Sequence, residues 1–357
     1  MFFCTIFDSN YLDKALVMLK SLYICSPESI VYVLAFDDKS EEFLDKKKLK
    51  NVVTIGLKQV ETPEITALKE RRSKAEYIWT FTPVFIEYVM ENFKVEYCTY
   101  IDVDMYFYSD PQILLDELVM KKKSVGLMEH RFRNTANGRK QLKNGKYCVE
   151  FNTFKNDFNG RRLLSLWKEL CIEECSLEKT VGDQGYISNW GEEFPNIVHE
   201  YQNFGGGVAP WNLSRYRLIR KKNKTYVIEN GRKKELIFYH FQGMAYQGND
   251  KVKMGVICID NGFVPRKYIR YLYYPYLQKL EAEKLYLKKD FDFEVLSRGR
   301  IEFAYVKFNL KGFLKSVQDR MSRKEYWEIL DLMARIVRKK QDIVILHNKV
   351  SKVDNQK

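Results

Sequence analysis

The feature that most constrains the fold is the alternation of apolar runs with helical periodicity along the first hundred residues. Within 11–24, Leu12, Leu16, Leu19 and Tyr23 recur at spacings of three and four, which indicates an amphipathic helix. A second helix is expected at 74–93, and apolar runs of strand length occupy residues 2–7, 30–36, 52–55 and 97–101. Strands that alternate with helices are typical of βαβ units. The sequence therefore predicts an α/β protein with a parallel central sheet.

The alternation becomes less regular after Asp104. Ser109-Asp110-Pro111 marks the start of a helix, and we expect strands at 125–128, 147–154 and 236–241 and a helix at 163–175. Segments beyond about residue 255 are aromatic, basic and helical, among them 324–340. Because single cores stop growing at roughly 250–300 residues, a chain of 357 residues suggests a body with an appended part. We place the body at residues 1–250 and a basic, aromatic, helical extension at residues 251–357.

The net charge of +13 is concentrated in this extension. Residues 251–357 hold 24 Lys/Arg and 13 Asp/Glu, whereas residues 1–250 hold 36 and 34. A nearly neutral body with a basic extension fits an enzyme that meets an anionic surface better than it fits a general polynucleotide binder. We therefore expect no nucleic-acid partner and a peripheral contact with an anionic membrane.

The hydropathy pattern also bears on location. No stretch reaches the ~18 uninterrupted apolar residues of a membrane span, and the apolar opening at residues 1–7 meets Asp8 too early for a signal peptide. Seven cysteines without framework spacing agree with reducing conditions. The expected location is the cytoplasm, with the extension able to contact the inner face of the cytoplasmic membrane.

The sharpest chemical signal is Asp102-Val103-Asp104, at the end of the apolar run 97–101. Side chains alternate along an extended chain, so Asp102 and Asp104 point to one side and Val103 to the other. Two carboxylates that share one cleft repel each other unless a cation lies between them. A hard divalent ion prefers oxygen ligands and is commonly completed by substrate phosphates. The alternative interpretation is a helix-capping aspartate beside a surface aspartate.

Four motifs occur in a fixed order: Thr5-Ile6-Phe7-Asp8-Ser9-Asn10-Tyr11, Tyr100-Ile101-Asp102-Val103-Asp104, Gly182-Asp183-Gln184 and Tyr239-His240-Phe241-Gln242-Gly243. Together they resemble the GT-A nucleotide-diphospho-sugar transferases, most closely the family 8-like bacterial enzymes that build lipopolysaccharide or capsule. The resemblance covers roughly residues 1–245. It implies a GT-A, Rossmann-like α/β fold whose central sheet is mixed but mostly parallel.

The resemblance further implies a UDP-sugar donor and a bound Mn²⁺ or Mg²⁺. Asp102 and Asp104 would hold the ion, and His240 would be its third protein ligand. Chemistry supports His240 independently, because it follows an apolar run at a strand end and precedes a glycine turn. A lone histidine in the core is the alternative.

The implied contacts to the nucleotide sugar are Thr5, Asp8, Asn10, Tyr11, Arg71, Lys74, Asp102 and Gly243. Asp8 and Asn10 would hold the uracil and ribose, with Tyr11 close to the base. Asp8 and Asn10 are also explained by helix capping, and the basic cluster Arg71, Arg72 and Lys74 by a solvated face.

The implied catalytic residues are Asp183, Gln184 and Asn152. Asp183 would hold sugar hydroxyls and Gln184 would approach the anomeric carbon, although a capping role also explains Asp183. The strand before this helix departs from the family pattern, so either Asn152 or Glu150 is left for a sugar contact. The family's diphosphate-binding lysine is missing after Gly243, and Lys251 or Lys253 could take its place.

The predicted function is metal-dependent transfer of a sugar from a UDP-sugar to a glycan or lipid-linked glycan in bacterial surface polysaccharide synthesis. Retention is expected, because the resemblance is to retaining enzymes and the sequence offers no well-placed base. The alternatives are a catalytically inactive GT-A protein that binds nucleotide sugar or glycan, a basic nucleic-acid-binding protein, and a nuclease that uses Asp102 and Asp104.

Overall fold

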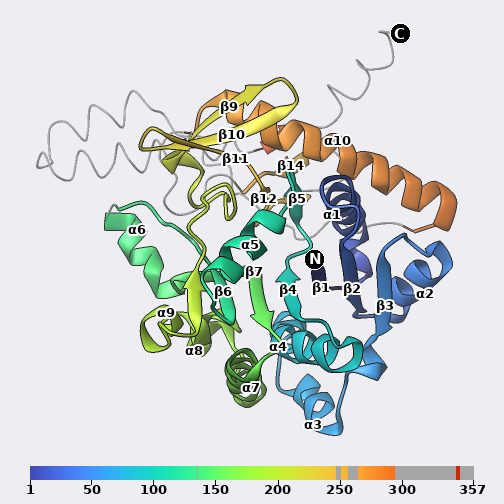
Figure 1. Cartoon of the computed structure of the whole chain (residues 1–357). Coiled ribbons are helices and arrows are strands. Elements are labelled where there is room, and N and C mark those ends of the chain that lie inside the picture. The colour runs from blue at the N-terminus through green and yellow to red at the C-terminus, as the bar shows by residue number, and fades with distance from the viewer. Residues whose placement is uncertain (135, 247–250, 256–263, 294–342, 346–357) are drawn as a thin grey trace, which may run out of the picture. The chain divides into compact units, whose positions relative to one another are not determined.

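The computed structural model describes residues 1–134, 136–246, 251–255, 264–293 and 343–345 (Figure 1). By packing, the chain forms two compact units. The first runs from Met1 to Phe241 and includes helix α10 (Arg266–Phe291); the second contains strands β13 (Ala245–Tyr246), β14 (Lys251–Lys253) and β15 (Ile343–Ile345). The predicted helix at 324–340 lies outside the described residues.

A seven-stranded sheet forms the centre of the first unit, in the order β3-β2-β1-β4-β7-β6-β8. Its strands are β1 (Phe2–Phe7), β2 (Ile30–Ala35), β3 (Val52–Gly56), β4 (Tyr97–Ile101), β6 (Val125–Glu129), β7 (Tyr147–Lys155) and β8 (Val198–Glu200). Only β7 runs antiparallel to its neighbours β4 and β6; the other pairs are parallel. The prediction of an α/β fold with a mixed, mostly parallel sheet is confirmed.

Two apolar layers cover the sheet, and the alternation of side chains along each strand assigns residues to one layer or the other. In β1, Phe3 and Phe7 join one layer, whereas Cys4 and Ile6 join the other. The first layer includes α1 (Leu12–Cys25), α2 (Asp38–Lys47) and α5 (Gln112–Met120), and the second includes α4 (Lys74–Phe93) and α7 (Phe158–Glu173). Both faces of the sheet are thereby buried, as parallel sheets require.

Helix boundaries follow local capping signals. At the start of α2, Asp37 and Ser40 form a reciprocal capping box, and Ser73 and Glu76 do the same at the start of α4. The predicted helix at 74–93 has the observed bounds of α4, and the strand at 97–101 those of β4. α7 begins at Phe158, five residues before the predicted start at residue 163, because Asp157 caps it there.

The long helix α10 packs against α1 within the first unit, and Figure 1 shows the two side by side. Its tyrosines Tyr268, Tyr273 and Tyr276 are buried. The Tyr273 hydroxyl lies 2.8 Å from that of Tyr239, and Tyr276 stacks on Phe241. These rings therefore stabilise the first unit. The functional division at residue 250 stays a prediction.

Smaller elements complete the first unit. A three-stranded antiparallel sheet consists of β9 (Arg217–Lys221), β10 (Lys224–Glu229) and β11 (Arg232–Glu235), and the pattern analysis did not predict it. Strands β5 (Met105–Phe107) and β12 (Phe238–His240) pair with each other. The remaining helices are α3 (Pro63–Thr66), α6 (Ala136–Gln141), α8 (Leu177–Thr180) and α9 (Trp190–Glu193). Among the described residues, no helix combines the length and apolar character needed to cross a bilayer.

Candidate metal and nucleotide-sugar site

Acidic side chains gather at one edge of the large sheet. Strands β1 and β4 are parallel, so their carboxyl ends lie at this edge and are followed by Asp8 and Asp102. Antiparallel β7 brings its first half to the same edge, where the Asp102 amide donates to the Glu150 carbonyl. Ligand sites in open α/β sheets form at this edge.

His240 reaches the aspartates through the pairing of β12 with β5. In this ladder His240 lies opposite Met105, and the Phe241 amide donates to the Asp104 carbonyl. The His240 Nε2 atom lies 2.9 Å from Asp104 Oδ1 and 3.6 Å from Asp102 Oδ2. One ligand atom from each of the three residues lies within 4.8 Å of the others. The predicted metal-ligand set is thus brought together in space.

Two positively charged groups balance the carboxylates of this cluster in this structure. Burial, with the charges of Asp104 and Glu150, raises the pKa of Asp102 to about 6, although His240 opposes the shift. Burial would also raise the pKa of Asp104, but the charges of Lys14 and His240 hold it below its usual range. Burial would lower the pKa of His240, yet the Asp104 charge and hydrogen bonds raise it well above its usual value. Carboxylates this close suit a divalent ion, and His240 and Lys14 supply positive charge among them in this structure.

Two further residues surround His240 on its buried side. Glu150 is completely buried, and its Oε2 lies 2.5 Å from His240 Nδ1. Cys148, two residues earlier in β7, is also buried and is near enough to form a second group of potential ligands with Glu150 and His240. Burial is the main cause that raises the pKa of the Cys148 thiol to about 12, so this group is less suited than the aspartates to a hard ion.

Lys14 is a site residue that sequence analysis missed. Its Nζ lies 3.5 Å from Asp104 Oδ2, and the same ammonium group lies 5.1 Å from the centre of the Tyr11 ring. Lys14 is in the first turn of α1, which starts at the carboxyl edge of the sheet. Lys14 follows Tyr11 by three residues in an amphipathic helix, so the two side chains lie on the same side of its first turn. This spacing could have indicated that Lys14 lies beside the predicted nucleotide-binding residue Tyr11.

The residues predicted to bind the nucleotide lie partly together. Asp8 accepts hydrogen bonds from the amide and side chain of Asn10 and forms an ion pair of 2.5 Å with Lys74. Asp8 therefore caps the turn at Ser9–Tyr11 and also contacts the start of α4. Thr5 is buried in β1, and its Oγ1 has no hydrogen-bond partner among the described residues. The nucleotide-binding roles of these residues stay predictions.

The predicted basic cluster divides in space. Arg71 lines a surface groove with residues of α4 and α7, among them Glu87, Lys168 and Glu173. Arg72 donates to the carbonyls of Cys171 and Ile172, at the end of α7. Of the three basic residues, Lys74 is the one that pairs with Asp8.

Asp183 is buried close to the metal-ligand set. Burial raises its pKa to about 7, with the Asp102 charge adding to the shift and a hydrogen bond to Thr82 opposing it. Asp183 precedes the turn Gln184–Ile187, but its side chain forms no capping hydrogen bond there. The side chain of Gln184 donates to the Asn144 carbonyl. The backbone amides of Asp183 and Gln184 instead hydrogen-bond to the Asp183 carboxylate, so a local capping role and the predicted sugar-binding role both fit its position.

Asn152 and Glu150 differ in their surroundings. Asn152 is buried, and its Oδ1 accepts from the Met128 amide near an irregularity in the pairing of β6 with β7. Glu150, in contrast, contacts His240. The sugar contact assigned to Asn152 stays a prediction, and its side-chain nitrogen Nδ2 has no hydrogen-bond partner among the described residues. Gly243, with a φ of 74°, and Lys251 and Lys253 belong to the second unit, and their roles also stay predictions.

The loop 203–212 covers the buried side of His240. Gly205, Gly206 and Gly207 are buried, and the Trp211 ring meets the His240 ring edge-on at 5.4 Å. The Trp211 indole donates to the His130 carbonyl and thereby holds the loop in place. The glycines permit close packing inside the protein, because a Cβ atom at Gly206 or Gly207 would lie against Met128.

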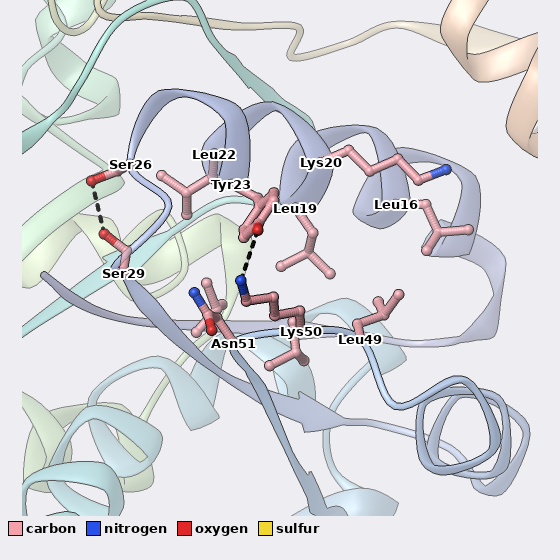
Figure 2. Close-up of a pocket in the computed structure, with 12 residues that line it drawn as sticks. Leu16, Leu19, Lys20, Leu22, Tyr23, Ser26, Ser29, Leu49, Lys50 and Asn51 are labelled. Carbon is pink, nitrogen blue, oxygen red and sulfur yellow. Dashed lines mark hydrogen bonds between the residues drawn. The ribbon is translucent and has the colours of Figure 1, made fainter.

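A separate cavity of about 130 Å³ lies between α1 and the first residues of β2 and β3 (Figure 2). Leucines of α1 form its apolar wall, and Lys50 donates to the Tyr23 hydroxyl across it. Its lining residues lie at the amino ends of the strands, away from the carboxylate cluster. Ligand pockets are typically about 300–1,000 Å³, so this cavity is too small for a nucleotide sugar.

Among solved structures, similarity is distant. The mouse xyloside xylosyltransferase 1 is 13% identical, with 68% of this chain and 97% of that chain covered and a TM-score of 0.44. The galactosyltransferase LgtC, in complex with donor and acceptor sugar analogues, is 14% identical, with 76% and 100% covered and a TM-score of 0.48. GlyE of Streptococcus pneumoniae TIGR4 is also 14% identical, with 57% and 45% covered and a TM-score of 0.38.

Similarity in sequence is closer. No family model matches the chain. The uncharacterized protein YfnD of Bacillus subtilis (strain 168) is 29% identical over 286 residues, which are 78% of this chain and 88% of YfnD. The uncharacterized protein YfnF of the same strain is 30% identical over 260 residues, which are 70% of this chain and 84% of YfnF. At this identity and coverage, the chain belongs to the same family as YfnF.

Proposed function

We propose that this protein is a GT-A glycosyltransferase that moves a sugar from a UDP-sugar to a glycan acceptor with the help of Mn²⁺ or Mg²⁺. The observation that carries the proposal is the meeting of Asp102, Asp104 and His240, with one ligand atom from each within 4.8 Å. The ordered sequence motifs supply the donor class. Mg²⁺ takes oxygen ligands almost throughout, so the imidazole among the ligands favours Mn²⁺.

In this reaction the bond between the anomeric carbon and the diphosphate oxygen breaks, and the acceptor oxygen forms the new bond to that carbon. The bound ion would supply Lewis-acid stabilisation of the departing diphosphate. Lys14, beside Asp104, is placed to add positive charge near the same phosphates. The acceptor proton passes to the leaving phosphate in a retaining reaction, so no side-chain base is required.

The donor would be held by groups on both sides of the ion. Asp8 and Asn10 bind the nucleoside in this proposal, and Tyr11 contacts the base. Thr5 also contacts the nucleotide, and Lys74 is fixed by its ion pair with Asp8. Asp183 binds sugar hydroxyls from its buried position, and Gln184 and Asn152 complete the sugar side. Arg71 faces a separate groove and Gly243 belongs to the second unit, so their proposed donor contacts rest on the family resemblance alone.

Asp104→Ala tests this proposal together with metal removal. Purified protein should hydrolyse or transfer a UDP-sugar with Mn²⁺ present, and both EDTA and Asp104→Ala should abolish turnover and weaken UDP binding. Asp116→Ala is the matched control, since Asp116 is an exposed aspartate of α5. Undiminished activity in EDTA contradicts the metal assignment, and UDP-sugar binding without turnover of any acceptor or water favours the catalytically inactive alternative.

We also propose that the acceptor is a lipid-linked glycan of bacterial surface polysaccharide synthesis, lipopolysaccharide or capsule, met at an anionic membrane. The sequence assigned this contact to the extension at residues 251–357, and the β9–β11 sheet of the body offers a second basic surface, because residues 217–235 hold eight Lys/Arg and two Asp/Glu. The strand register places Arg217, Lys221, Lys224 and Lys233 on the same face as the half-buried Ile219, Tyr226 and Ile228. Basic side chains around an apolar centre suit a lipid headgroup layer.

Vesicle sedimentation tests the membrane contact. The protein should pellet with anionic vesicles at low salt, release as salt rises, and ignore neutral vesicles. Lys221→Glu with Lys233→Glu should weaken pelleting, whereas Lys121→Glu with Lys122→Glu, the same charge change after α5, should not. Equal binding to neutral and anionic vesicles contradicts the proposed membrane contact. An equal loss of pelleting in the two double variants would show that the β9–β11 sheet is not the contacting surface.

A further inference from the structure

Glu150 has a relation to His240 that the sequence motifs do not assign. Its side chain is completely buried in β7, and its Oε2 lies 2.5 Å from His240 Nδ1. The other ring nitrogen, Nε2, faces Asp104 at 2.9 Å and Asp102 at 3.6 Å. The imidazole therefore lies between a buried carboxylate on one side and the two aspartates on the other.

The proton distribution on His240 follows from this geometry. An ionised carboxylate only accepts hydrogen bonds, so the contact with Glu150 requires a proton on Nδ1. By the same rule the contact with Asp104 places a proton on Nε2 in this structure, so His240 is positively charged here. An ion held by Asp102 and Asp104 would displace the Nε2 proton, and with Nδ1 still protonated toward Glu150 the lone pair would then be on Nε2. This is the tautomer in which His240 can act as a metal ligand on that side.

The surroundings hold Glu150 in place. Its second oxygen, Oε1, has no hydrogen-bond partner among the described residues. The carboxylate is therefore bound through Oε2, by the hydrogen bond with His240. Gly207 closes the site, since a Cβ atom there would lie 2.6 Å from Met128 Sδ and 3.4 Å from Glu150 Oε1. The φ of Gly207 is also positive, at 71°, which glycine adopts without strain.

We propose that Glu150 is the positioning residue of the metal site: it fixes the tautomer and orientation of His240 so that Nε2 is presented to the ion held by Asp102 and Asp104. This inference rests on the proposed function for the existence of the metal site. It assigns Glu150 to the ion rather than to the sugar. Partners of this kind raise the basicity of a ligating histidine, and their loss typically costs about 10–100-fold in metal affinity.

The competing arrangement is an ion on the other side of the ring. Cys148, Glu150 and His240 offer three buried ligand atoms within 4.8 Å of one another. Such a site would use Nδ1, and its thiolate would select a softer ion than Mn²⁺. The buried arrangement requires the Cys148 thiolate and a free lone pair on His240 Nδ1, whereas the arrangement with Asp102 and Asp104 requires neither. Experiments on Cys148 and on the His240 tautomer therefore distinguish them.

Mn²⁺ binding to the full-length protein tests the proposal without any turnover assay. The free Mn²⁺ signal in electron paramagnetic resonance gives Kd, and the electron spin echo reports a coordinated nitrogen. Glu150→Gln should raise the Kd for Mn²⁺ about 10–100-fold and weaken the nitrogen signal. Glu117→Gln is the matched control, because Glu117 holds His199 at 2.7 Å in the same way but away from the aspartates. Cys148→Ala should leave Mn²⁺ binding unchanged.

The outcomes separate this inference from the proposed function. If the wild-type protein binds no Mn²⁺, the metal site itself fails. If it binds Mn²⁺ through nitrogen and Glu150→Gln binds equally well, Glu150 is not a positioning residue although the metal site stands. A loss of binding in Cys148→Ala would move the ion to the buried side and overturn the proposal.

One measurement needs no variant of Glu150 and therefore survives a folding defect. The chain has four histidines, so ¹⁵N-histidine labelling gives few signals. With diamagnetic Cd²⁺ bound, the His240 ring should show a protonated Nδ1 and a coordinated Nε2. The opposite tautomer would overturn the inference.

Discussion

The molecule contains two histidine–glutamate pairs with similar contacts and different surroundings. His199 Nε2 lies 2.7 Å from Glu117 Oε1, and His240 Nδ1 lies 2.5 Å from Glu150 Oε2. Glu117 also accepts from the amides of Gln202 and Asn203, so both of its oxygens tie α5 to the segment after β8. The His199 pair therefore acts as a structural connection.

The His240 pair differs in what surrounds its imidazole ring. His199 meets the ring of Tyr201 edge-on, whereas His240 presents Nε2 to Asp104 and Asp102. A histidine–glutamate contact is thus no sign of a metal site by itself. The arrangement becomes suited to a metal ion when oxygen ligands converge on the other nitrogen.

The largest expected effect comes from removing each histidine in turn. His240→Ala should reduce kcat/KM by at least ~10³-fold, because Lewis-acid stabilisation of the leaving group amounts to several kcal/mol. His199→Ala should keep kcat/KM within about threefold and lower Tm instead. Steady-state kinetics and thermal melts of both variants check this. Similar activity losses in the two variants would break the comparison.

Asp183 extends the comparison to a buried acid whose neighbouring charge is another acid. Its pKa is about 7 in the folded protein, against about 3.9 in an unfolded chain. Between these values the folded state holds a proton that the unfolded state has lost, so the stability contribution present below pH ~4 disappears as pH rises through 7.

Asp183→Asn should therefore be more stable than the wild type at pH 8 by about 4 kcal/mol, and the difference should vanish toward pH 4. Urea unfolding of the metal-free proteins across this range provides the measurement. Asp116→Asn, at an exposed position, should show no such trend. A difference independent of pH would exclude the burial of charge as its cause.

The same substitution should impair catalysis. Asp183→Asn removes a charged hydrogen-bond acceptor from the sugar side, so kcat should fall about 10–100-fold with KM for the donor within about threefold. Initial rates with saturating acceptor measure both constants. An unchanged kcat would leave Asp183 outside the sugar site, with a role in folding or ion binding.

The smallest effect concerns the structural pair. Glu117→Gln should lower the free energy of unfolding by about 1–3 kcal/mol, since its charged hydrogen bonds to His199 and two backbone amides weaken. Asp116→Asn, on the neighbouring exposed position, provides the baseline. Denaturant melts check the prediction, and loss of Mn²⁺ affinity in Glu117→Gln would show that the two pairs are coupled.

Elements with strong local signals were predictable. The helix at 74–93 and the strand at 97–101 match α4 and β4, because capping and hydrophobic periodicity depend on neighbouring residues. The β9–β11 sheet was missed, since its short strands are rich in Lys and Arg and only Leu218 and Val227 are fully buried apolar residues in them. Its pairing depends on the rest of the fold.

The sequence by itself determined the type of sheet and the choice of candidate metal ligands, because strand alternation alone puts Asp102 and Asp104 on one side of the chain. Tertiary structure decided their partners. The pairing of β4 with β7 and of β5 with β12 brings Glu150 and His240 into contact although 90 residues separate them, and Lys14 reaches Asp104 across the same separation. It also divided Arg71 from Lys74, three positions apart in the chain. Such contacts follow from the order and register of strands distant in sequence, which no local pattern of residues specifies.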